Sequence, residues 1–188
     1  MGDAQDLGDR RLEAEALLEL ASLTRLSGSV DEAQALLDEA LEIHRKIGHR
    51  AGEAEVLRNM ALVCKQRGRI GQARALYENA LAIQREVGSR AAQALLMGNI
   101  AALDHEEGRL ESAADAYRAA LALHRIQADR KSEAVILGNI ASLAREQGQV
   151  EEARDLAANG QLDEAVLEVN LGGTMIWPVL GLLGDYRD

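Results

Sequence analysis

The sequence predicts an all-α fold, a right-handed superhelical solenoid in which antiparallel helix pairs stack in chain order. The first observation is a forty-residue unit: residues 91–130 align without a gap with residues 51–90, and the same step continues in both directions. A fixed period of this length is typical of stacked-repeat proteins. The second is composition, because apolar residues make up 47% of the chain and aromatic residues only 2%. Alanine and leucine must therefore build the core, which favours helices over strands.

The period divides the chain into three parts. Residues 7–10 (Leu-Gly-Asp-Arg) match residues 47–50 (Ile-Gly-His-Arg), so we interpret residues 1–10 as the remnant, a last turn, of a preceding repeat. Residues 11–158 are the predicted array, and residues 159–188 are a degenerate C-terminal cap and apolar tail. The repeats within the array are 11–50, 51–90, 91–130 and 131–158.

The first helix of each unit is predicted from the spacing of its apolar residues. In the third unit Leu96, Ile100 and Leu103 recur at steps of four and three, which places them on one helical face. A glycine follows this helix in every copy, because the left-handed conformation of a helix C-cap is adopted at little cost only by glycine. These glycines are Gly28, Gly68, Gly108 and Gly148.

The second helix begins about two residues after that glycine. Asp31 and Glu32 place negative charge near the positive end of its dipole. Alanines recur on both helices, at positions where we expect two helices to approach closely. They are Ala21, Ala61, Ala101 and Ala141 on the first helices and Ala40, Ala80 and Ala120 on the second.

The turn after the second helix is marked by Gly48 and Gly88. The third copy has Ala128 at this position, so we expect that turn to be less sharply defined. Ser89 and Asp129 follow, and both are favourable N-caps for the next first helix.

The fourth unit departs from the pattern, since the sequence of residues 161–165 (Gln-Leu-Asp-Glu-Ala) resembles that of residues 149–153 (Gln-Val-Glu-Glu-Ala) after only twelve residues. We predict a shortened helix to Ala158, a turn at Asn159-Gly160 and a last short helix. The apolar tail with Trp177 has three interpretations. It caps the open end of the last helix pair, lies in the groove of its own or a neighbouring chain, or is a disordered extension. We favour the cap, because a terminal repeat leaves its apolar face bare.

The charge and the absence of targeting segments limit the function. The formal net charge is −10, which argues against general binding to nucleic acid phosphates. No segment resembles a signal peptide or is long and apolar enough to span a bilayer, so we expect a cytoplasmic protein that does not bind membranes.

No catalytic, cofactor or metal site is predicted. Cys64 is a single cysteine at a helix-packing position, and we expect a buried, inert thiol. His44 and His124 occupy the same position two repeats apart, too far along a solenoid to share a metal. His49 and His105 are scattered relative to them, which argues against a zinc site.

Each unit combines a glycine, an apolar residue and an alanine at fixed spacing. In two units a tyrosine and an Ala-Leu pair follow, at Tyr77 and Ala80-Leu81 or at Tyr117 and Ala120-Leu121. This combination resembles the tetratricopeptide repeat. The resemblance covers residues 11 to about 158. Forty-residue versions are similar to those of the Pins/LGN adaptors, kinesin light chain and bacterial signalling arrays. The resemblance implies a non-catalytic protein-interaction module, one part of a larger signalling or regulatory protein. The alternative is a structural module that self-associates through its ends and its C-terminal tail.

In arrays of this family the first helices line a concave groove, and the resemblance places three asparagines and four basic or potentially basic residues there. Asparagine both donates and accepts hydrogen bonds and can hold an extended peptide backbone, while a basic row favours carboxylates on that peptide. The opposing interpretation is that the asparagines cap or bridge helices and the basic residues are only solvated. The predicted groove residues are Asn59, Asn99, Asn139, Arg25, Lys65, His105, Arg145, Leu62, Ala102 and Ser142.

Overall fold

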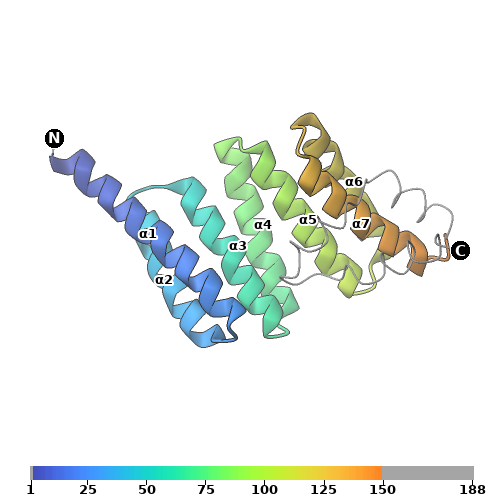
Figure 1. The fold of residues 1–188 in the computed structure, drawn as a ribbon, viewed down its shortest axis with the longest axis horizontal. Coiled ribbons are helices and arrows are strands. Elements are labelled where there is room, and N and C mark those ends of the chain that lie inside the picture. The colour runs from blue at the N-terminus through green and yellow to red at the C-terminus, as the bar shows by residue number, and fades with distance from the viewer. Residues whose placement is uncertain (1, 150–188) are drawn as a thin grey trace, which may run out of the picture. The chain divides into compact units, whose positions relative to one another are not determined.

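The computed structural model describes residues 2–149, and in this range it contains seven helices and no strand (Figure 1). The predicted all-α repeat fold is confirmed. The predicted helix to Ala158, the turn at Asn159-Gly160, the cap and the Trp177 tail lie outside the described residues. The helices are α1 (Gly2–Leu26), α2 (Val30–Lys46), α3 (Arg50–Gln66), α4 (Ile70–Val87), α5 (Arg90–Glu106), α6 (Leu110–Ile126) and α7 (Arg130–Glu146).

The helices follow the forty-residue period closely. From α3 onward each first helix begins at an arginine, at Arg50, Arg90 or Arg130. The glycines predicted to end the helices adopt positive φ angles, from 68° at Gly48 to 93° at Gly28. A residue with a Cβ atom is strained at positive φ, and this explains why glycine recurs at these positions.

Ala128 contradicts the expectation of a loosened turn. Its φ is 55°, so it adopts the same left-handed conformation as Gly48 and Gly88. The turn also keeps its backbone hydrogen bond, since the Asp129 N–H donates to the His124 carbonyl at 3.1 Å. The surrounding repeat imposes the turn, and the alanine bears the conformational strain.

The first ten residues do not form a separate turn. Helix α1 runs without interruption from Gly2 through Gly8, which is not among the glycines with positive φ. Residues 2–10 therefore extend the first helix, and their descent from an earlier repeat stays a prediction.

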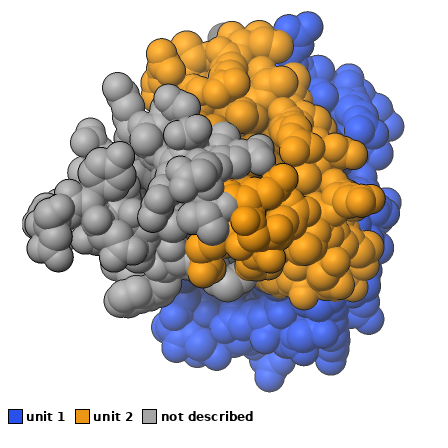
Figure 2. All heavy atoms as spheres, turned by 90° about the vertical axis from the view of Figure 1, so that its right-hand side faces the viewer, with its two compact units in different colours: residues 1–96 blue, residues 97–188 orange. Residues whose placement is uncertain are grey.

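The chain divides into two compact units, residues 1–96 and residues 97–188, coloured blue and orange in Figure 2. In the first unit α1 packs on α2, α2 on α3 and α3 on α4, and α1 also contacts α3. The alanines at the predicted contacts are buried, with Ala21 at 1% exposure and Ala40, Ala61 and Ala80 at 0%. Small side chains at these points let the helix backbones approach closely.

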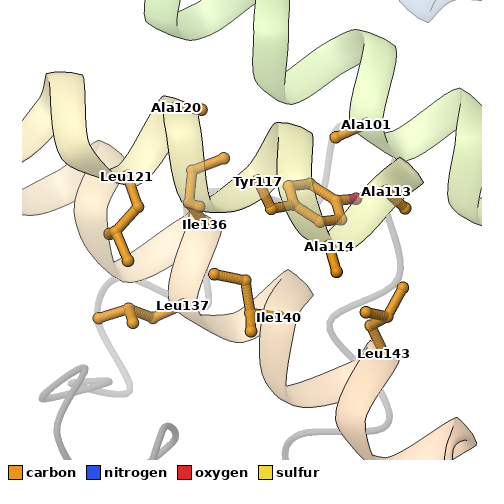
Figure 3. Close-up of a cluster of buried hydrophobic side chains, with 10 residues drawn as sticks. All are labelled: Ala101, Ala113, Ala114, Tyr117, Ala120, Leu121, Ile136, Leu137, Ile140 and Leu143. Atoms are coloured by element: carbon orange, nitrogen blue, oxygen red, sulfur yellow. The ribbon is translucent and has the colours of Figure 1, made fainter. Parts of the chain in front are cut away.

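In the second unit, α6 and α7 pack together around a core that also includes Ala101 of α5 (Figure 3). The ring of Tyr117 is 1% exposed and lies beside Ala113 and Ala114 of its own helix. From α7, Ile136, Ile140 and Leu143 extend the cluster. Burial raises the pKa of the Tyr117 hydroxyl, so the group stays neutral. None of the described helices combines the length and hydropathy needed to cross a bilayer.

Candidate functional site

In the first unit, the first helices α1 and α3 are joined through Asn59. The Ser22 hydroxyl of α1 donates to the Asn59 side-chain oxygen at 3.3 Å. The Asn59 amide nitrogen in turn donates to the backbone carbonyl of Glu55 at 3.0 Å. Asn59 is only 4% exposed. Asn59 therefore bridges two helices in this structure, which is the alternative to peptide binding that the sequence left open for the asparagines.

A pair of arginines lies near this bridge. Arg25 of α1 is half-buried, and its Nε is buried without a hydrogen-bond acceptor among the described residues. Burial lowers the pKa of Arg25, and the positive charge of Arg58 on α3 lowers it further. Arg58 is paired with Glu55, at 3.1 Å from Nε to Oε1, whereas Arg25 pairs with no carboxylate in residues 2–149. The two guanidinium groups leave a surplus of positive charge that an anion would stabilise.

Sequence reasoning missed Arg58 because it has no repeating counterpart. The equivalent positions in the next two copies are Gly98 and Gly138, so no basic column marks this position. Leu62 and Lys65 continue the α3 stripe at intervals of about one helical turn, and both are half-buried. The predicted residues of the first unit thus lie on two contacting helices, with Arg58 added.

The two asparagines of the second unit differ from Asn59. Asn99 on α5 and Asn139 on α7 are half-buried, and neither side chain makes a hydrogen bond to a residue in the described part of the chain. The positions equivalent to Ser22 in the next two copies are Leu62 and Ala102, and neither side chain can donate. These two amides therefore keep their donors and acceptors available.

The remaining predicted residues of the second unit are in different environments. His105 Nε2 lies 3.0 Å from the Glu146 carboxylate, which joins α5 to α7, although the approach is not aligned for a hydrogen bond. Ser142 is 3% exposed, and its hydroxyl has no partner within residues 2–149. Arg145 is exposed and forms no ion pair there. Ala102 is half-buried and packs against the unit's core.

The structure corrects the prediction for one histidine. His49 is not scattered but lies against His44, with their Nδ1 atoms 3.2 Å apart. The turn after α2 folds the chain back, so residues five apart meet. Among the described residues no group of three or more His, Cys, Asp or Glu side chains is arranged to hold a metal ion. Cys64 is buried at 8% exposure, and its Sγ lies 3.9 Å from Oε1 of Gln72.

A comparison with protein families places most of the described chain in one family. The model of a family described as "Tetratricopeptide repeat" matches residues 12–86 and again residues 54–126. Together the two matches span more than half of the chain. A search of curated protein sequences gave no match.

Several solved structures share this fold. Aspartyl phosphate phosphatase F from Bacillus subtilis superposes with a TM-score of 0.76 at 13% identity, over 85% of this chain and 41% of the phosphatase. A Rap protein complexed with competence and sporulation factor gives 0.75 at 14% identity, over 93% of this chain and 54% of its own. BtubC from P. vanneervenii gives 0.69 at 18% identity, over 98% and 85%. The chain spans less than half of the phosphatase, and at these identities the similarity shows the fold alone.

Proposed function

Because the chain belongs to the tetratricopeptide repeat family, we propose that it is a non-catalytic protein-interaction module within a larger signalling or regulatory protein. It binds an extended or helical segment of a partner protein on the first helices. The observation that carries this proposal is the state of Asn99 and Asn139, half-buried amides with no hydrogen-bond partner in the described chain. Neither amide has an atom among the buried atoms that lack a partner, so both are accessible, and the backbone of a bound segment would donate to and accept from them.

Within each unit, basic side chains on the first helices favour an acidic segment. Arg25 is half-buried beside Arg58 and lacks a carboxylate partner among the described residues, and Arg145 is exposed and equally without an ion pair there. A carboxylate that reached Arg25 would offset its burial and its repulsion from Arg58. One structural relative, a Rap protein, was solved as a complex with competence and sporulation factor, so this fold is compatible with ligand binding.

Capture of the partner from the native lysate, followed by peptide mapping, tests the proposal. The binding affinity of the mapped segment is then compared between the wild-type protein and Asn99→Ala/Asn139→Ala. Loss of two hydrogen bonds of about 1 kcal/mol each predicts at least roughly tenfold weaker binding. Asn79→Ala, at an exposed asparagine on α4, is the matched control and should bind as the wild type does. Unchanged affinity of the double variant would remove the groove assignment.

A second candidate function, self-assembly through the ends of the array, is favoured by one feature of α1. Leu23 is 64% exposed, whereas the equivalent Val63, Leu103 and Leu143 are at most 2% exposed. Leu20 is also exposed, at 49%. An apolar helix face of this kind is available to another copy of the chain. Mass measurement over a dilution series tests this candidate, and a monomer at all concentrations would exclude it.

A further inference from the structure

The turn between α2 and α3 holds one carboxylate between two arginines. Glu53 lies in the first turn of α3, and its side chain is only 9% exposed. Arg45 donates from Nε to Oε1 at 2.9 Å, and Arg50 donates to Oε2 at 2.5 Å. Burial would raise the pKa of Glu53, but the hydrogen bonds from Arg45 and Arg50 outweigh it and hold the pKa below its usual value. The carboxylate therefore stays ionised and clamped.

The turn between α6 and α7 repeats this arrangement eighty residues later. Arg125 donates from Nε to Oε1 of Glu133 at 2.8 Å, and Arg130 donates to Oε2 at 3.3 Å. The Glu133 side chain is 12% exposed. Two turns of the array thus place a mostly buried carboxylate between the same two arginine positions.

The turn between α4 and α5 has the arginines without the carboxylate. Arg85 and Arg90 occupy the two arginine positions, but Gln93 replaces the glutamate. Although α4 ends one position later than α2, the start of α5 matches that of α3, since the Gln93 N–H donates to the Ser89 carbonyl at 3.0 Å, as the Glu53 N–H does to that of His49. The Gln93 amide donates to the Gln84 carbonyl at 3.0 Å instead of accepting from the arginines.

Both arginines are consequently left without a partner in the described chain. Arg85 and Arg90 are exposed, and neither forms an ion pair or a side-chain hydrogen bond with any of residues 2–149. In a chain of net charge −10, two such guanidinium groups at one turn are a local exception. Their forked donors match the geometry of a carboxylate, which the other two turns supply from within the chain.

We propose that Arg85 and Arg90 form a second docking point, which binds an aspartate or glutamate side chain of a partner protein in the position that Glu53 and Glu133 fill in the other turns. Charge complementarity identifies the occupant, because in the other two turns the equivalent pair of arginines binds a glutamate carboxylate. The docking point lies at an inter-repeat turn and does not involve Asn99 or Asn139. The experiment that tests this docking point is therefore independent of the one that tests the proposed function.

NMR of the arginine side-chain Nε–Hε groups in the full chain tests the proposal directly. The probe is the capped peptide acetyl-Ala-Ala-Glu-Ala-Ala-amide, with the glutamine version as its control. The glutamate peptide should shift the resonances of Arg85 and Arg90 saturably, whereas the glutamine peptide should not. Arg69, exposed and without an ion pair among the described residues, reports nonspecific charge effects. Equal shifts at Arg69, or a response to inorganic phosphate and none to the peptide, would overturn the assignment.

Exchange of the glutamate and glutamine between turns provides the matched variants. Gln93→Glu supplies the carboxylate from within the chain and should weaken peptide binding at Arg85 and Arg90 by about tenfold or more. Glu133→Gln should open the equivalent position, so that Arg125 and Arg130 begin to respond to the peptide. If Glu133→Gln fails to fold, Gln93→Glu decides alone. An undiminished response of Arg85 and Arg90 in that variant contradicts the proposal.

Discussion

His44 and His49 face each other across the turn between α2 and α3, with their Nδ1 atoms 3.2 Å apart and their ring centroids separated by 5.0 Å. His44 is 1% exposed, and its Nε2 is buried without a partner in the described chain. At this separation one ring can donate to the other only while the accepting nitrogen is unprotonated. The contact therefore depends on at least one neutral ring.

We predict that this pair makes the fold less stable in mild acid. Burial lowers the pKa of His44, and the nearby His49 lowers it further, although Glu15 and Glu53 partly oppose the shift. The unfolded chain then binds a proton at His44 before the folded chain does, as pH falls below about 6.5. The contribution of His44 to stability is complete above that pH and is lost as the pH decreases further.

Thermal unfolding between about pH 7.5 and 5.5 measures this effect. His44→Gln is the matched variant, because Gln84 occupies the equivalent buried position in the next repeat. The melting temperature of the wild type should fall more steeply with acidification than that of the variant. Parallel curves would show that His44 does not carry the dependence.

A second prediction concerns Gly52, which packs against both histidines. A Cβ atom at this position would lie 2.4 Å from Cε1 of His44 and 2.5 Å from Nδ1 of each ring. Although alanine is the better helix former, we expect Gly52→Ala to destabilise the fold by about 1–3 kcal/mol because of this overlap. Urea denaturation gives the change in the free energy of unfolding.

Gly138→Ala is the control for Gly52→Ala. A Cβ atom at Gly138 in α7 has no neighbour within 4 Å, so the variant should gain roughly 0.5–1 kcal/mol from helix propensity. If both alanine variants changed stability in the same direction, the contact with the histidines would not explain the glycine.

Ala128 leads to a third prediction. Its φ of 55° is unfavourable for a residue with a Cβ atom, whereas glycine adopts it freely. Ala128→Gly should therefore stabilise the protein by about 0.5–1 kcal/mol, after the greater flexibility of glycine in the unfolded chain is subtracted. The reverse change, Gly48→Ala, should cost a similar amount. Calorimetric melting temperatures that moved in the opposite directions would contradict this explanation.

Asp104, which is buried, and Arg109, which is exposed, form an ion pair that is specific to the third repeat. The Asp104 side chain is 4% exposed and accepts from Nε of Arg109 at 2.8 Å and from Ser112 at 2.7 Å. Arg109→Ala removes the hydrogen bond and the positive charge that Arg109 supplies to this buried carboxylate, and we expect a loss of about 1–3 kcal/mol. Adding Asp104→Ala should restore part of the stability, because Ala144 shows that the position accepts alanine. Additive losses in urea denaturation would argue against coupling.

The features predictable from the sequence depend on local, repeating chemistry. The helix boundaries follow from the period, from glycines such as Gly68 with φ of 71°, and from alanines such as Ala61 with 0% exposure. The left-handed turns and the close helix contacts recur from copy to copy, so a glycine or an alanine at a fixed spacing indicates them. The expectation failed at Ala128, where the surrounding repeat overrides the local preference.

The candidate site was less predictable, because its contacts join residues that have no repeating counterpart. The hydrogen bond from Ser22 to Asn59 joins residues 37 positions apart, and among the described residues it occurs only between the first helices α1 and α3. Arg58 was missed for the same reason. The absence of a carboxylate at Gln93 could have been found by aligning the copies, since Glu53 and Glu133 occupy the equivalent positions. A departure from the repeat was therefore more informative about binding than the repeat itself.

The most direct test of the central claim is photo-crosslinking to the captured partner from single positions on the chain. A photoreactive amino acid at Ala102, on the same face of α5 as Asn99, should crosslink the mapped partner segment. The same group at Ala122, exposed on α6, should not. Crosslinks from Ala102 alone would agree with binding along the first helices. Crosslinks from Ala122 and none from Ala102 would contradict it.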